Sequence, residues 1–270
     1  MKNIIARYRY SLLLLKQLVK TDFKLRDQGS TLGYLWSLLR PLALFAILYL
    51  VFAKVFRIGD AVPHFPVYLL TGIVIWNYFT EVTTGSVGAI VGKGDLLRKI
   101  NFPKYVIILA GSFSALINLI LNSIIIAIFI VINDVDIRIT VVLLPLLIIE
   151  LFAFSLAIAF FLSAAFVRFR DINYIWEVIM QAAFYATPIL YPLALVFSQS
   201  ALAAKIIMLN PIAQIIQDVR YVLITPETQT ISDVFGFAWA RLIPIGLVLL
   251  LILISAWYFK SRSKYFAEEV

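Results

Sequence analysis

The 270-residue sequence contains no cysteine and only one histidine, His64. The absence of cysteine excludes a disulfide, a thiolate metal site and a cysteine nucleophile, and a lone histidine excludes a metal or haem site with several histidine ligands. Charged residues make up only 14% of the chain, whereas about a quarter of the residues of a soluble domain are charged. There is also no Gly-rich phosphate-binding loop, so the chain does not bind ATP through one.

Hydrophobic residues account for 63% of the chain, which predicts an all-α integral membrane protein. The net charge is +8, and in a membrane protein such an excess indicates topology and lipid contact, so we expect no nucleic-acid partner. The four leucines at 12–15 are followed by Lys16 and Lys20. This apolar run is too short for the core of a cleavable signal peptide, and none is expected.

Six segments are long and apolar enough to cross a bilayer, for which a helix needs about 20 residues. Pro188 and Pro192 interrupt the fifth of them. With an even number of spans, both termini lie on the same side of the membrane. The predicted spans are 36–56, 66–90, 105–132, 141–167, 174–192 and 242–259.

The distribution of lysine and arginine predicts which side holds the termini, because cytoplasmic loops carry an excess of these residues. Seventeen of the 23 Lys and Arg residues fall within residues 1–40, the loops 92–104 and 168–173, and the tail from residue 260. The other six fall on the opposite side. The N- and C-termini are therefore predicted to be cytoplasmic.

Residues 3–27 carry apolar side chains at helical spacing, while Lys16, Lys20 and Lys24 form a row on another face. This pattern predicts an amphipathic helix lying in the cytoplasmic interface. A simple membrane anchor and a surface that contacts a partner both fit the pattern, and both interpretations stay open.

The segment 193–241 between the last two spans is long for a loop without structure of its own. The stretches 201–209 and 211–224 have amphipathic patterns, and Pro211 suits the first turn of the second. We expect short helices on the outer surface, or partly in the membrane, that cap the bundle.

Carboxylates are too few to indicate an enzyme. The two inner loops contain only Asp95 and Asp171, each among arginines and lysines, which argues against a Mg²⁺-dependent transferase acting on lipid phosphates. Glu81, Glu150 and Glu177 are the only acids in the spans, and single acids on different helices do not make a proton relay. No catalytic residue and no metal ligand is expected.

Aromatic residues follow one face of the first span and one face of the fifth. Such rows most often pack against neighbouring helices or lipid. A row that lines a path would instead offer weak, repeated contacts to sugar rings. The residues are Phe45, Tyr49, Phe52 and Phe56, with Tyr34 extending the row inward, and Gln181, Phe184 and Tyr185 in the fifth span.

Arg40 and Pro41 stand inside the apolar stretch LGYLWSLLRPLALF (32–45), although arginine is costly in lipid and proline interrupts helices. Residues 41–56 cover about 24 Å of helix, less than the ~30 Å hydrocarbon core. Arg40 is therefore predicted to lie near the inner boundary, about a turn or two deep, where its side chain can reach the interface. Pro41 is predicted to lie where the helix starts or bends.

The loop GKGDLLRKINFPK (92–104) has the composition of a short helix opened by Asp95. Its apolar residues Leu96 and Leu97, beside Arg98 and Lys99, would suit a cytoplasmic protein partner. An ordinary positively charged inner loop explains the same residues.

Five stretches together resemble the permease subunits of ABC-2 type exporters, in particular those that export lipid-linked polysaccharides such as O-antigen and teichoic acid. The resemblance runs from about residue 3 to the C-terminus, and the motifs occur in the family's order. They are LGYLWSLLRPL (32–42), DLLRKINFPK (95–104), FVRFRDI (166–172), ATPILYP (186–192) and NPIAQIIQDVR (210–220).

The resemblance implies a single transmembrane domain over residues 1–270, with six spans, that works as a homodimer in the bacterial cytoplasmic (inner) membrane. A separate ATPase subunit would hold ATP and Mg²⁺, so no cofactor is expected in this chain. The interface helix 3–27 and a coupling helix would contact that ATPase, and short gate helices would cover 198–232. The coupling residues would be Asp95, Leu96, Leu97, Arg98 and Lys99.

The substrate that the resemblance implies is a polyprenyl-diphosphate-linked glycan, such as the O-antigen of lipopolysaccharide. The aromatic rows of spans one and five would line its path, and Arg40, Arg168 and Arg170 at the inner rim would face the diphosphate. Topology and interface anchoring explain the same arginines equally well. Other functions considered are an ABC-2 permease for drugs or small lipids, a membrane glycosyl- or phosphotransferase, and a lone secondary transporter.

Overall fold

The computed structural model describes residues 2–25, 33–95 and 102–266, and every regular element within these ranges is a helix. The predicted all-α fold is therefore confirmed for the described part of the chain. The long helices are α1 (Lys2–Leu25), α2 (Trp36–Tyr49), α3 (Phe65–Val87), α5 (Tyr105–Ile132), α6 (Leu144–Arg168), α7 (Ile172–Ala186) and α12 (Leu242–Arg262). The shorter ones are α8 (Leu193–Gln199), α9 (Ala201–Met208), α10 (Pro211–Leu223) and α11 (Ile231–Phe235).

Four helical stretches of the described chain are long and apolar enough to cross a membrane. They cover Trp36–Val55, Tyr105–Ile132, Ile139–Arg168 and Ala238–Arg262. These ranges agree with the predicted first, third, fourth and sixth spans to within a few residues. A fifth crossing is counted if α9 and α10, which meet at 97°, are taken as one broken span.

The helix α3 is not among these four, although it corresponds to the predicted second span. It packs against α5 and α6 in the middle of the bundle, and 17 of its 23 residues are buried. A helix enclosed by other helices does not need a continuous apolar surface toward lipid, so α3 carries Asn77, Thr80 and Glu81. Protein packing therefore accounts for its modest hydropathy.

The helix α7 has only 15 residues and ends at Ala186, two residues before Pro188. The residue before a proline is driven out of the helical region of backbone space, which explains this end. The predicted fifth span of 174–192 is thus a shorter helix followed by an irregular segment over 187–192.

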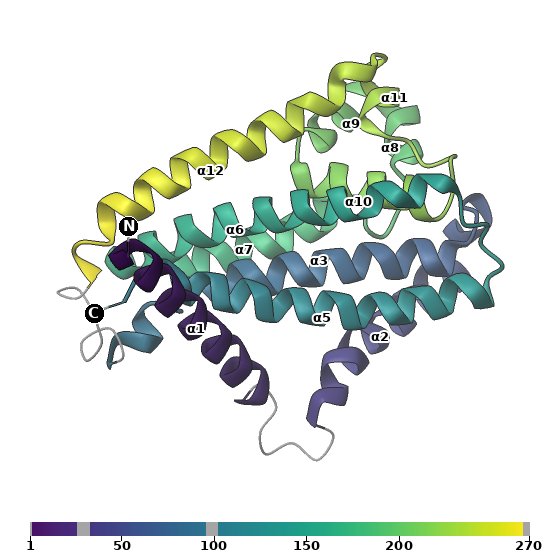
Figure 1. Cartoon of the computed structure of the whole chain (residues 1–270). Coiled ribbons are helices and arrows are strands. Elements are labelled where there is room, and N and C mark those ends of the chain that lie inside the picture. Colours follow the sequence, from purple (N-terminus) through teal and green to yellow (C-terminus); the bar gives the residue numbers. More distant parts are fainter. Residues whose placement is uncertain (1, 26–32, 96–101, 267–270) are drawn as a thin grey trace.

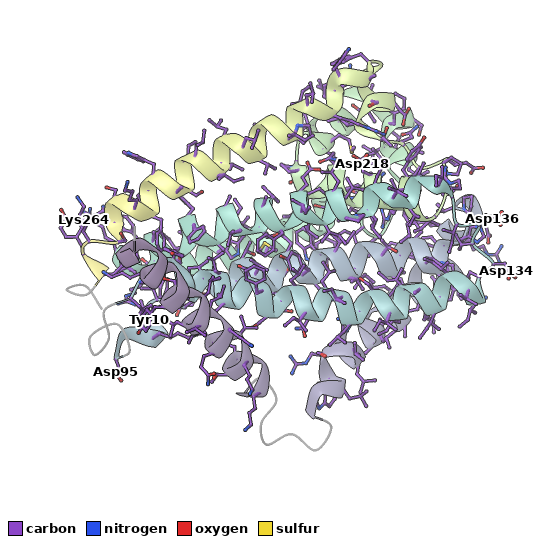
Figure 2. All side chains as sticks on the ribbon, viewed as in Figure 1. Tyr10, Asp95, Asp134, Asp136, Asp218 and Lys264 are labelled. Atoms are coloured by element: carbon purple, nitrogen blue, oxygen red, sulfur yellow. The ribbon has the colours of Figure 1, made fainter. Side chains whose placement is uncertain are left out.

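The bundle has two distinct ends (Figure 1). The start of α1 and the end of α12 lie at one end, and α8, α9 and α11 gather near the start of α12, toward the other end. Figure 2 shows Asp95 and Lys264 at the first end and Asp134 and Asp136 at the opposite end. This arrangement agrees with the predicted placement of both termini on the same side. We call the end with Asp95 and Lys264 the terminal end.

Candidate functional site: a polar cavity between α2, α3 and α5

A cavity of about 410 Å³ lies between α2, α3 and α5. Eight of the thirteen residues that line it are polar or charged, which is unusual inside a helical membrane bundle. Polar side chains in such positions are costly in lipid, and they therefore mark this cavity as the candidate functional site. Its lining comprises Ser37, Arg40, Pro41, Leu44, Val74, Asn77, Tyr78, Thr80, Glu81, Ala115, Asn118, Leu119 and Asn122.

Pro41 shapes the α2 wall of the cavity. It is buried inside α2, which begins at Trp36, so Pro41 is an interior residue of the helix and not its start. Because proline has no N–H, the carbonyl of Ser37 four residues earlier receives no helical bond from it. The amide Nδ2 of Asn122 on α5 donates to this carbonyl at 3.4 Å. The proline thereby provides a backbone acceptor that joins α2 to α5.

Glu81 and Asn118 join the other two helices of the cavity. The Nδ2 amide of Asn118 donates to both carboxylate oxygens of Glu81 at 3.1 Å. Glu81 lies six residues before the end of α3, a rise of about 9 Å. The α3 wall of the cavity therefore begins about two helical turns from the end of α3 and continues away from that end to Val74.

Hydrogen-bonding capacity remains in the cavity wall. Of the described residues that line the cavity, Tyr78, Thr80 and Asn122 each have a buried oxygen without a hydrogen-bond partner, namely Tyr78 Oη, Thr80 Oγ1 and Asn122 Oδ1. Unpaired buried polar atoms cost roughly 1–3 kcal/mol each. A polar occupant could satisfy them after small side-chain rotations, whereas an apolar one could not.

Among the described residues that line the cavity, Arg40 is the only cation, and its side chain is exposed. An exposed guanidinium at the edge of a polar cavity can bind a phosphate with two parallel hydrogen bonds. Arg40 and Glu81 both line the cavity. The predicted depth of Arg40, about a turn or two from the inner membrane boundary, stays a prediction.

The predicted aromatic row on the first span is divided in the structure. Phe45 is buried, stacks on Tyr49 with ring centroids 5.6 Å apart, and meets Phe129 of α5 edge-on at 5.2 Å. The ring centroid of Phe52 lies 5.7 Å from that of Phe56, and Phe56 is exposed. The inner part of the row thus packs within this chain and Phe56 faces outward, while the channel role of the row stays a prediction.

On α7, Gln181 and Tyr185 are exposed, and Phe184 is half-buried against Trp76 of α3 at 5.8 Å. One face of α7 therefore remains open in the isolated chain. The side chain of Tyr34 lies outside the described residues.

Of the remaining predicted rim and coupling residues, the structure describes three: Arg168 at the end of α6, Arg170 just after it, and Asp95 at the terminal end (Figure 2). Arg168 and Arg170 are exposed, and each lies over a neighbouring phenylalanine ring, Phe169 at 5.3 Å and Phe166 at 5.2 Å. Asp95 is exposed. The other predicted coupling residues, 96–99, lie outside the described residues.

An ion pair connects α1 to the short helix just before the predicted coupling segment. Lys93 Nζ lies 3.2 Å from Asp22 Oδ1, and both side chains are about one-third exposed. The pair joins the predicted interface helix to the Val91–Lys93 turn. A movement of α1 would therefore be transmitted to the Val91–Lys93 turn, and the reverse also holds.

A second polar feature, which the sequence analysis missed, is the buried side chain of Arg220 on α10. Its exposed fraction is 0%, and its guanidinium lies 3.5 Å from the centre of the Tyr68 ring. It donates to the carbonyls of Tyr68 at 3.0 Å, Pro188 at 2.5 Å and Ile189 at 2.8 Å. One side chain thereby fastens α10 to α3 and to the irregular segment after α7.

Gly72 makes room for this guanidinium. A Cβ atom at position 72 would lie 2.4 Å from Nη2 of Arg220, closer than such atoms approach in proteins. From the sequence, Arg220 was counted only among the six Lys and Arg residues on the side opposite the termini. The signal that could have revealed its role is an arginine in the amphipathic helix α10, together with a glycine inside α3.

A third feature is a buried polar cluster between α6 and α10. Gln214 Nε2 donates to Asp218 Oδ2 at 2.6 Å, and both residues are buried. Glu150 of α6 lies within electrostatic reach of both. Sequence reasoning treated Glu150 as isolated, whereas the fold brings a second carboxylate to it from 68 positions further along the chain.

Replacing Asn118 by leucine is expected to destabilise the bundle by roughly 1–3 kcal/mol, because the carboxylate of Glu81 loses its amide donor. The double variant Glu81→Leu/Asn118→Leu is expected to recover much of this loss, since both polar partners are then removed. Unfolding temperatures in detergent would measure both. A single variant as stable as the parent protein would show that the pair does not hold α3 to α5.

The fold and the cavity define a multi-pass helical membrane protein with a polar site inside its bundle. Among the residues of the described ranges, no three His, Asp or Glu side chains gather as a metal site. Residues 14–224 match the family model described as ABC-2 type transporter. The chain belongs to this family.

The relatives that the chain resembles are export permeases. It is 30% identical over 263 residues to the O-antigen export system permease protein RfbA of Myxococcus xanthus, with 97% of each chain covered. It is 28% identical over 210 residues to a protein of the same name from Klebsiella pneumoniae, which covers 77% of this chain and 78% of that protein. The chain is therefore the membrane subunit of a transporter and not an enzyme, and family membership implies a separate ABC ATPase subunit as its partner.

Proposed function

We propose that this permease exports a polyprenyl-diphosphate-linked polysaccharide of the O-antigen type, driven by ATP hydrolysis on the partner ATPase. The observation that carries the proposal is the polar cavity with Arg40 at its edge. A guanidinium suits a diphosphate, and amide and hydroxyl side chains suit sugars. The names of the relatives support this substrate class.

In the proposed arrangement the chain crosses the bacterial cytoplasmic membrane six times, with α3 and α7 as the second and fifth crossings and both termini in the cytoplasm. The length of α3 supports its crossing, because 23 residues cover about 34 Å. The 17 to 6 distribution of Lys and Arg supports the orientation. The terminal end of the bundle then faces the cytoplasm and the ATPase.

The functional unit in this proposal is a homodimer, and the exposed face of α7 supports it. Gln181 and Tyr185 on this face are exposed in the single chain. A glycan passing between two protomers would contact these residues and the exposed ring of Phe56. Aromatic and amide side chains would give the weak, repeated contacts that sliding of a polymer requires.

The proposed coupling to ATP hydrolysis runs through α1 and the segment that begins at Asp95. The ion pair between Asp22 and Lys93 supports this route, because it joins α1 to the turn directly before that segment. A push on the coupling segment by the ATPase would then also displace α1.

Reconstitution into vesicles with the ATPase subunit would test the proposed function. ATP-dependent movement of a labelled polyprenyl-diphosphate glycan to the far leaflet is the expected result. Movement of drugs or small lipids without movement of the glycan would replace this substrate by a smaller one. Turnover of a lipid phosphate by the purified chain alone would overturn the transporter assignment.

Reversing Asp22 to lysine is expected to lower ATP-driven export severalfold while hardly changing the unfolding temperature. Partly exposed ion pairs contribute about 0–1 kcal/mol to stability, so the effect should lie in coupling. The double variant Asp22→Lys/Lys93→Asp is expected to restore export because it rebuilds the pair. Lys20→Glu, on an exposed position of the same helix, is the control for a general charge effect. Export that is equally low in the double variant would contradict the proposed route.

A further inference from the structure

A second large cavity, of about 450 Å³, lies at the terminal end of the bundle and shares no lining residue with the cavity at Arg40. It is formed where the start of α5 and one side of α6 meet the end of α12. Because α12 has 21 residues, a length of about 31 Å, its last turn reaches a membrane boundary when the helix crosses a ~30 Å core. The lining consists of Phe102, Pro103, Lys104, Tyr105, Phe160, Ala256, Phe259, Lys260 and Ser263.

The walls of this cavity are apolar and well supported. The rings of Phe160 and Phe259 meet edge-on with centroids 4.9 Å apart, and Phe259 meets Phe266 at 5.4 Å. Lys104 Nζ lies 5.4 Å from the centre of the Phe266 ring and donates to the backbone carbonyl of Ser263. These contacts join α5, α6 and α12 around the cavity.

The lining of the cavity carries a positive charge. Two lysines, Lys104 and Lys260, belong to the lining, and the described residues that line it include no acid. Lys260 is exposed, and Arg262 follows in the same last turn of α12. A site with cations at the membrane boundary and aromatic walls toward the core fits a molecule with an anionic head and an apolar chain.

We propose that this cavity binds an anionic phospholipid of the surrounding leaflet. The phosphate lies against Lys260 with the positive charge of Lys104 nearby, and one acyl chain lies along Tyr105, Phe160 and Phe259. Basic pockets between membrane helices on the cytoplasmic side recognise anionic head groups in this way. A free phosphate ion would leave the aromatic walls uncovered, and a zwitterionic lipid would gain little from the two lysines. The bound lipid would hold the end of α12 against α5.

The test uses the full-length protein extracted from membranes that contain phosphatidylglycerol and phosphatidylcholine. Native mass spectrometry then measures the lipid that the protein retains. Retention of phosphatidylglycerol over phosphatidylcholine is expected for the parent protein. Lys260→Gln is expected to lower that preference about fivefold, from the loss of one interfacial lysine.

Two further variants separate the proposed site from a general charge effect. Ala256→Phe, which fills the cavity without changing a charge, is expected to lower retention of phosphatidylglycerol to a similar degree. Lys264→Gln removes an exposed cation outside the lining and is expected to change nothing. Equal losses in the Lys264 and Lys260 variants would overturn the proposal, as would equal retention of both lipids. Displacement of the lipid by inorganic phosphate alone would show that the site binds a free anion.

Discussion

Replacing Arg220 by leucine is expected to abolish export and to destabilise the protein on the order of 5 kcal/mol. The guanidinium is fully buried and donates to three backbone carbonyls, of Tyr68, Pro188 and Ile189. Each buried carbonyl that loses its donor costs about 1–3 kcal/mol. The loss is large because leucine restores none of the hydrogen bonds and because no water from the membrane core can replace them.

The same contacts can be disturbed without touching the arginine. In Gly72→Ala the new methyl group would lie 2.4 Å from Nη2 of Arg220, so the guanidinium must leave its carbonyls or α3 must move away from α10. Gly85→Ala is the matched control, because it adds the same methyl group to the same helix where nothing lies within 4 Å. Unfolding temperature and ATP-driven export measure the two variants side by side.

The expected order is the parent protein and Gly85→Ala highest, Gly72→Ala lower, and Arg220→Leu lowest. A Gly72→Ala variant as stable and active as Gly85→Ala would show that the Arg220 side chain can adopt another conformation without loss of stability or export. The conclusion that one side chain fastens α10 to α3 and to the segment after α7 would then be wrong. Arg220→Lys is expected to behave like the leucine variant, since one ammonium cannot reach carbonyls in three directions as the fork of a guanidinium does.

Reversing the charge of Arg40 is expected to lower both binding and export of the lipid-linked glycan by about 10- to 100-fold. A hydrogen bond to a charged group is worth about 1.5–3 kcal/mol, and every 1.4 kcal/mol is a factor of ten. Arg40→Glu loses this contact and adds repulsion toward the diphosphate. Because the side chain is exposed, the unfolding temperature is expected to stay close to that of the parent protein.

Two companion variants isolate the position from the charge. Arg40→Lys keeps the charge but not the two-pronged geometry, and it is expected to retain an intermediate activity. Lys54→Glu makes the same reversal at an exposed position further along the same helical segment, outside the cavity. Normal export by Arg40→Glu, or an equal loss with Lys54→Glu, would remove Arg40 from the proposed head-group site.

The spans that face lipid could be predicted closely. The predicted span 105–132 coincides with α5, and the ends of the predicted first and fourth spans lie within two residues of those in the structure. Lipid imposes a continuous apolar run on such helices, and that run is written in local sequence. The predicted second span started at residue 66, one position after the first residue of α3, Phe65. The burial of α3 on nearly all sides could not be predicted from its sequence.

The candidate site could be predicted only in part. Arg40 was recognised because an arginine beside a proline is conspicuous in an apolar run. The other polar residues of the cavity wall were not recognised. Asn77, Asn118 and Asn122 are scattered in the sequence, and only the packing of α3 against α5 brings them together. The same holds for the terminal-end cavity, whose lining comes from three segments that are far apart in the chain.

The sequence by itself determined that this chain is helical, that it is a membrane protein, and where its lipid-facing helices begin and end. These properties follow from composition and from patterns within about 20 residues. Only the tertiary structure decided what the polar residues do. Arg220 was assigned to the outer surface from the sequence, but it is buried and holds α10 to its neighbours. The Ser37 carbonyl, which Pro41 leaves without a helical hydrogen bond, accepts one from Asn122, 85 positions further along the chain. A polar group inside a membrane bundle must find its partner on another helix, and which helix that is depends on packing across the whole chain.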